Sequence, residues 1–369
     1  MLKKTKASVL AFGMLLTASA FAHHHDDMKI SANFDMNYTH WSNGGSGNSG
    51  EAIPNHMHNT NANELNIQLA EIALSGSHKS LDYWVSFDAA QLSADGEFSN
   101  FITEAYLTQN INDQFSVTAG RFYGNLGFES IRAKDNWNYS RSLGFQYNPF
   151  WHQGVAANYD SGQGFAASVF AYNEINGVDS DTEHKSYSVQ LSYARDNFAA
   201  TYNYYTRGAG ESFQAQGNDG LEIHDLSVRY DFNEQFSAAI NYIMTEAAVN
   251  GGDDAEWSSL AAYVHYQANE RWDFNLRYEM FEAENLAATG AGTFADNVFS
   301  RNAASTQTTA FTKNKINSIT LTAGYDLMNN SKLMLEYRMD KSDEEIWGDE
   351  DGNADDSQNT IALAWVFSI

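Results

Sequence analysis

The charged residues best suited to act on a solute or an ion lie within one stretch of the chain, residues 124–150. The stretch combines acidic and basic side chains with aromatic ones, among them Trp137 and Tyr139. Opposed charges that face each other across a narrow aqueous passage orient polar solutes and set ion preference. The candidate residues of this kind are Glu129, Arg132, Lys134, Asp135 and Arg141.

A second set of charged residues alternates with apolar residues in several extended stretches. Mixed rows of this kind have two interpretations. The charges pair across neighbouring strands and brace a hydrated wall, or they line a passage whose acidic excess favours cations. The residues concerned are Glu104, Asp225, Arg229, Asp273, Arg277, Glu279, Glu336 and Arg338.

Histidines supply one candidate metal site and no catalytic site. If the chain is cleaved after Ala22, it begins His23-His24-His25. A free amine, two backbone amides and a third-position imidazole suit square-planar Cu(II) or Ni(II), although a disordered polar tail is the alternative. His224 and His265 lack a suitably spaced serine partner for a hydrolytic triad. We therefore expect no enzyme, no cofactor and no other metal site.

The N-terminus has the layout of a secretory signal peptide. Lys3, Lys4 and Lys6 precede an apolar core from Ala7 to Leu16, and Ala20-Phe21-Ala22 is a small-x-small cleavage site. The core is too short to span a bilayer as a helix, which needs roughly 20 apolar residues. The sequence thus predicts a signal peptide over residues 1–22 and one exported domain over residues 23–369.

Composition narrows the class of this exported domain. The chain of 369 residues has no cysteine, only 2 prolines, 14% aromatic residues and a formal net charge of −26. The missing cysteines exclude a disulfide framework, and few prolines suit long strands. Strong acidity excludes nucleic acid as a partner, since binding its backbone requires clustered Lys and Arg.

Alternation of apolar and polar residues is the main structural signal. From Trp272 to Met280, every second residue is apolar and the residues between are polar or charged. One such strand also fits a soluble β-sandwich, but a membrane barrel repeats the pattern around the whole chain. The same pattern recurs in residues 30–38, 81–88, 186–193, 225–232, 236–244, 333–340 and 361–369.

Connections alternate between short polar turns and longer segments, as in outer-membrane barrels. Counting by this rule predicts sixteen antiparallel transmembrane strands in an all-β, up-and-down barrel, or fourteen if long segments are misassigned. Both termini then lie on the periplasmic side, and residues 124–150 form the third long connection. In so wide a barrel the lumen stays open unless a loop folds inward. Residues 124–150 are therefore either an inward-folded constriction or an ordinary surface loop.

Four short motifs carry a resemblance to a known family. They are Glu104–Leu107, Thr118–Phe122, Asp135–Ser142 and His152–Val155, of which Asn136–Ser142 is the most specific. These motifs resemble the putative β-barrel porin-2 family, the OmpL-like porins of bacterial outer membranes. The resemblance is clear over residues 100–160 and implies an outer-membrane channel. It names no solute and transfers no catalytic residue.

The sequence thus predicts a porin of the outer membrane of Gram-negative bacteria. It would pass small hydrophilic solutes or ions by diffusion and favour cations. The alternative is a non-conducting structural or adhesive barrel whose loops bind external partners. Expected partners are membrane lipids, lipopolysaccharide and the barrel-assembly machinery, which would read the apolar last strand ending at Phe367 and Ile369. A homotrimer is expected by analogy with other sixteen-stranded porins.

Overall fold

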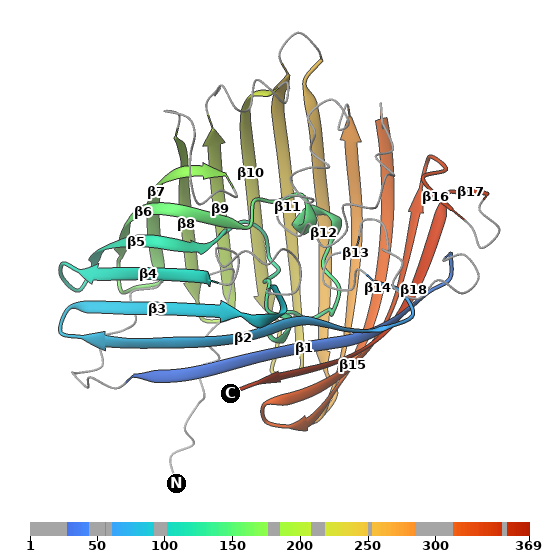
Figure 1. Ribbon diagram of the computed structural model, residues 1–369, viewed down its shortest axis with the longest axis horizontal. Helices are drawn as coiled ribbons and strands as arrows, with labels where there is room; N and C mark the ends of the chain where they lie inside the picture. Colours follow the sequence, from blue (N-terminus) through green and yellow to red (C-terminus); the bar gives the residue numbers. More distant parts are fainter. Residues whose placement is uncertain are drawn as a thin grey trace.

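The computed structural model describes residues 28–43, 56, 61–91, 102–175, 185–207, 218–249, 253–284, 313–348 and 353–369. Sixteen antiparallel strands form one closed barrel in which neighbours in sequence pair along the wall (Figure 1). The barrel closes where β1 (Lys29–Trp41) pairs with β18 (Ser357–Ser368). The predicted all-β barrel and its count of sixteen strands are confirmed. No helix in the described residues is long and apolar enough to cross a membrane.

The strands differ in length around the barrel. On one side they have 8 to 11 residues, as in β3 and β7, whereas β14 on the other side has 16. The strands between β1 and β18 are β2 (Leu65–His78), β3 (Leu81–Asp88), β4 (Ile102–Asn110), β5 (Phe115–Tyr123), β6 (Trp151–Asp160), β7 (Phe165–Ile175), β8 (Ser186–Arg195), β9 (Phe198–Arg207), β10 (Asn218–Asp231), β11 (Phe236–Val249), β12 (Ala255–Gln267), β13 (Trp272–Glu284), β14 (Lys313–Met328) and β15 (Ser331–Ser342).

Short helices and one small sheet lie in the connections. The helical turns are η1 (Ala89–Gln91), η2 (Ala133–Asp135) and α3 (Leu143–Gln146), and the last two belong to the β5–β6 connection. Between β15 and β18, the strands β16 (Trp347–Gly348) and β17 (Ala354–Asp355) form a separate two-stranded sheet.

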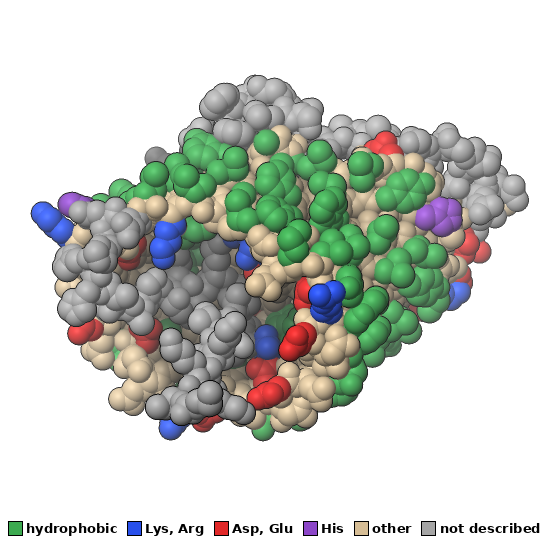
Figure 2. Space-filling view, turned by 90° about the horizontal axis from the view of Figure 1, so that it is seen from below, with side chains coloured by type: hydrophobic (Ala, Val, Ile, Leu, Met, Phe, Trp, Pro, Cys, Tyr) green, Lys and Arg blue, Asp and Glu red, His purple; other side chains and the backbone are tan. Residues whose placement is uncertain are grey.

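The alternating sequence pattern separates an apolar outer surface from a polar interior. On β13 the apolar residues Trp272 and Leu276 are 42% and 38% exposed, whereas Asp273 and Arg277 between them are buried. Figure 2 shows hydrophobic side chains spread over the outer wall and charged side chains around a hollow. This is the arrangement that a bilayer requires, because lipid contacts the outside of the barrel and water its lumen.

Two glycines let the short strands approach closely. A Cβ atom on Gly120 of β5 would lie 2.1 Å from the backbone oxygen of Ala105, and one on Gly154 of β6 would lie 2.1 Å from that of Ala171. Gly120 also has a φ of +143°, a conformation that L side chains rarely adopt. The two glycines are paired across β5 and β6. Since glycines in strands permit local bending, they shape the wall where the chain leaves β5 and enters β6.

Candidate functional site

The β5–β6 connection, residues 124–150, bonds to the inner wall on several sides of the barrel. In Figure 1 it lies between the two walls, with α3 drawn inside the barrel. Its backbone and side chains reach strands far apart in the sheet, which is possible only from within. The wall partners are Asp35 of β1, Glu71 of β2, Glu104 of β4, Asn203 of β9, Asp225 of β10, Arg277 and Glu279 of β13, and Glu336 of β15.

Two wall carboxylates each accept a pair of backbone N–H groups from the segment. Glu336 accepts from the amides of Tyr139 (2.7 Å) and Ser140 (2.9 Å). Glu279 accepts from Leu143 and Gly144 at 2.8 Å each, the amides that begin α3. Amides inside the barrel that lack strand partners need other acceptors, and carboxylates make strong bonds of this kind. Both glutamates are thus part of the support of the segment.

Arg132 attaches the segment to the opposite wall. Its guanidinium donates to Glu71 through two nitrogens at 2.7 Å and to Glu104 at 2.7 Å. It also lies 5.3 Å from the ring centre of Tyr123 and 5.6 Å from that of Trp84. Burial opposes the charge, but the carboxylates of Glu104 and Glu71 raise the pKa of Arg132 well above its ordinary value. Arg132 therefore stays charged with two acidic partners.

Three further arginines stabilise the middle of the segment. Arg277 donates to Glu129 at 2.7 Å and to the carbonyl of Ser140 at 2.6 Å. Arg141 turns back and donates to the carbonyls of Ser130 (2.8 Å) and Ile131 (2.5 Å). Arg338 donates to the carbonyl of Arg141 at 2.8 Å. All three guanidinium groups are almost wholly buried, so they serve the fold of the segment.

The most specific motif of the sequence, Asn136–Ser142, makes many of these contacts. The Asn136 side chain bonds both the amide and the carbonyl of Ser130, at 2.8 and 2.7 Å. The hydroxyl of Tyr139 donates to Asp35 at 2.8 Å. Ser142 caps α3 by accepting from the Phe145 amide at 3.1 Å and donates to Glu129 at 2.6 Å. The motif therefore specifies how the segment folds on itself and where it meets the wall.

The remaining candidate residues lie at the edges of this network. Lys134 and Asp135 form an exposed pair at 2.8 Å, and Asp225 accepts from the Gly127 amide at 3.0 Å. Arg229 pairs with Asp231 on its own strand at 2.9 Å and lies over the Trp137 ring.

Asp273 binds Lys332 at 2.6 Å across β14. A Cβ on Gly324 of β14 would lie 2.5 Å from the Asp273 carboxylate, so a larger residue there would displace that side chain.

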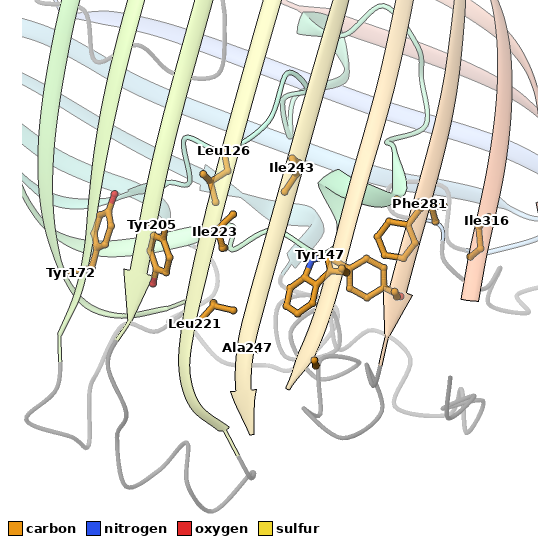
Figure 3. Close-up of a cluster of buried hydrophobic side chains, with 14 of the residues drawn as sticks. Leu126, Tyr147, Tyr172, Tyr205, Leu221, Ile223, Ile243, Ala247, Phe281 and Ile316 are labelled. Atoms are coloured by element: carbon orange, nitrogen blue, oxygen red, sulfur yellow. The ribbon is translucent and has the colours of Figure 1, made fainter. Parts of the chain in front are cut away.

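Apolar contacts fix the other side of the segment. Leu126, Leu143 and Tyr147 pack against inward-facing residues of β7 to β14, and the Tyr147 and Phe281 rings stack at 5.1 Å. Figure 3 shows Leu126 and Tyr147 among Tyr205, Ile223 and Ile243. On this side the lumen is filled by a hydrophobic core.

Sequence reasoning missed Asp35, Glu71 and His56 as parts of this site. Asp35 and Glu71 are the only acidic residues of β1 and β2, a signal that could have found them. The alternation in β2 breaks at a register shift opposite Asp35 and Met36, which obscures the inward orientation of Glu71. His56, from the β1–β2 connection, binds Asp340 at 3.1 Å, and nothing in the sequence predicts that contact.

Nearly the whole chain matches one family model. The model described as putative beta-barrel porin-2, OmpL-like, matches residues 27–369. The chain belongs to this family. The resemblance seen around residues 100–160 thus extends over the full barrel. Among curated proteins, none matches the chain.

Solved structures similar to this porin-2 chain share its fold. The anion-selective porin from Comamonas acidovorans aligns with a TM-score of 0.62 at 10% identity, covering 93% of this chain and 99% of its own. The DcaP channel of Acinetobacter baumannii gives 0.59 at 13% identity, covering 93% and 97%. OmpF of Salmonella typhi, in complex with daunomycin, gives 0.58 at 15% identity, covering 93% and 98%. At these identities the likeness establishes the barrel alone.

The candidate Cu(II) or Ni(II) site of this porin-2 chain, His23, His24 and His25, lies outside the described residues. Within the part that the structure describes, no three His, Asp or Glu side chains are grouped so that they could hold a metal ion.

Proposed function

We propose that the chain is an outer-membrane channel for passive diffusion of small hydrophilic solutes or ions, with residues 124–150 as its constriction. The observation that carries the proposal is the attachment of this segment to opposite walls from inside the barrel. Membership of a porin family supports a conducting barrel. Solutes would pass through the part of the lumen that is occupied neither by this segment nor by the hydrophobic core around it.

We further propose that the channel favours cations. Around the segment, the single cation of Arg132 contacts two carboxylates. In the hydrogen bonds described for Asp35 and Asp225, every donor is an uncharged group. A surplus of fixed negative charge raises the local concentration of cations. Several acids are already bonded to backbone amides, however, which limits the surplus that an ion meets.

A structural or adhesive barrel is the second candidate. The observation in its favour is the near-complete burial of the segment and its arginines, together with the hydrophobic core of Leu126, Leu143 and Tyr147. A lumen filled further by other connections would not conduct.

Single-channel recording in a planar bilayer separates the two candidates. The refolded mature chain should give discrete open steps, and a salt gradient should give a reversal potential of the sign expected for cations. A folded, heat-modifiable barrel without steps would contradict the channel and leave the adhesive barrel. Open steps with an anion-biased potential would contradict only the cation preference.

A further inference from the structure

His265 of β12 contacts the constriction segment inside the barrel, near the short turn that joins β12 to β13. Its ring stacks on the ring of Trp137, with the two ring centres 5.3 Å apart and the planes inclined by 22°. Trp137 belongs to residues 124–150, and the Arg229 guanidinium lies 5.1 Å from the centre of the same ring. His265 is half-buried. A titratable side chain thus lies directly against the segment.

The hydrogen bonds of His265 fix the position of its proton. Asn275 donates from Nδ2 to the Asp273 carboxylate at 2.7 Å, and a carboxylate bound to Lys332 can only accept. The Oδ1 atom of Asn275 therefore faces His265. Their contact of 2.6 Å requires a donor at Nδ1 of the imidazole. In the neutral ring Nδ1 carries the proton, and Nε2 is left as an acceptor.

The second ring nitrogen of His265 is accessible from the lumen. Within the part of the chain that the structure describes, Nε2 makes no hydrogen bond, and it is not one of the buried atoms that lack a partner. In His152, by contrast, both ring nitrogens are buried. Histidine is the side chain whose charge ordinarily changes between pH 5 and pH 8. Nε2 of His265 can therefore take up a proton from the lumen.

The charged side chains described around His265 are already engaged with one another or with the segment. On β11 the residue opposite His265 is the neutral Ser237. Glu336 lies two strands beyond Asn275, and its carboxylate accepts two amides of the segment. A proton on His265 therefore adds one positive charge to a region whose other charges are held in bonds. The ion pairs of this region are Arg229 with Asp231 at 2.9 Å, Lys332 with Asp273 at 2.6 Å, and Arg277 with Glu129 at 2.7 Å.

We infer that His265 is a specificity-determining residue whose protonation lowers the preference of the channel for cations. The inference rests on the proposed function, a conducting barrel with residues 124–150 as its constriction. A positive charge repels cations and attracts anions over about one Debye length, about 10 Å at 0.1 M salt. Because His265 contacts Trp137 of the constriction, ions that pass this residue come within that range. The channel should therefore favour cations most at neutral pH and lose part of that preference in acid.

The test is the reversal potential of the refolded mature chain in a planar bilayer under a fixed salt gradient, measured at pH 8 and at pH 5. The ratio of cation to anion permeability should fall about twofold further in wild type than in H265Q. This is the size expected for one charge about 8 Å from the ion at about 0.1 M salt. H265Q keeps a neutral polar side chain that takes up no proton. H265K carries a permanent charge, so its ratio at pH 8 should already lie about twofold below that of wild type.

The matched control is H224Q, which removes a histidine from the outer face of β10, where it bonds to Tyr202. H224Q should keep the full pH response of wild type. An equal response of wild type and H265Q would overturn the assignment, and so would a wild-type ratio in H265K at pH 8. Both results presuppose open steps and leave the channel itself intact, whereas the absence of steps in every variant would contradict the channel and the assignment together. If H265Q does not fold, H265N is measured against the same outcomes.

Discussion

The buried carboxylates of this barrel have two different roles. Glu71 and Glu104 neutralise Arg132, whereas Glu279 and Glu336 accept backbone amides. A count of charges in the sequence cannot distinguish these uses, because the partners lie on a segment up to 197 residues away in the chain. The formal acidity of the chain is therefore a poor measure of the charge that an ion meets inside.

Replacing Arg132 should loosen the segment. R132Q leaves Glu71 and Glu104 buried without their cation, and breaking a buried pair of this kind costs about 3–5 kcal/mol. We expect a lower urea midpoint of unfolding and a noisier open-channel current. K134Q is the matched control, since Lys134 lies two residues away and pairs only with the exposed Asp135 among described contacts. Equal noise in both variants would show that Arg132 does not hold the segment.

His56 should make one contact of the β1–β2 connection sensitive to acid. Burial lowers the pKa of His56, aided by Arg338, although Asp340 opposes the shift. When the contact with Asp340 is broken, His56 binds protons more readily, because its pKa returns to the ordinary value of about 6.5. The contact between His56 and Asp340 is therefore strongest above that pH and weakens as the pH falls below it.

Hydrogen exchange of the peptide containing His56 should accelerate between pH 7 and pH 5, after correction for intrinsic exchange rates. H56Q should lack the acceleration. H40Q, which changes an exposed histidine of β1, should keep it. An unchanged profile in H56Q would assign the effect to another group.

At the scale of elements, the strands follow from sequence far better than the segment does. Alternation identifies β13 and its neighbours because one face of each strand contacts lipid and must be apolar, whereas the other faces the lumen and can be polar. The path of residues 124–150 depends on contacts with Glu279 and Glu336, which no local pattern encodes. The mixed charges indicated this segment as a candidate constriction, and the motif Asn136–Ser142 is the most specific part of its family resemblance. Neither observation shows which strands of the wall each residue contacts.

The short-strand side should be sensitive to added volume. In G154A the new methyl group would overlap the backbone oxygen of Ala171, and forcing a group into packed structure typically costs about 1–3 kcal/mol. We expect a lower urea midpoint for G154A. G220A on β10 is the control, because its nearest neighbour would be 3.4 Å away. Equal stability of the two variants would mean that β6 and β7 separate at little cost.

At the scale of the whole molecule, the net charge inside the barrel depends on the bonds between the segment and the carboxylates of the wall. Removing the segment would break its bonds to Asp35, Asp225, Glu279 and Glu336 and expose these carboxylates to water, although Asp225, Glu279 and Glu336 keep bonds to wall residues. Replacing residues 127–147 with a short glycine-serine link should therefore raise conductance and shift the reversal potential further toward that of a cation-selective pore. A wider pore usually selects less, so a shift toward zero would contradict this account. Circular dichroism and heat modifiability establish that the variant is folded.

The contacts of Tyr139 have a consequence for the order of assembly. Its hydroxyl binds β1 and its amide binds β15, the strands on either side of β18 where the barrel closes. The segment is synthesised long before β15 and β18, and contacts of such sequence separation carry a large closure entropy. The segment can therefore dock fully only when the last strands arrive. Narrowing of the lumen by the segment should therefore coincide with closure of the wall between β1 and β18.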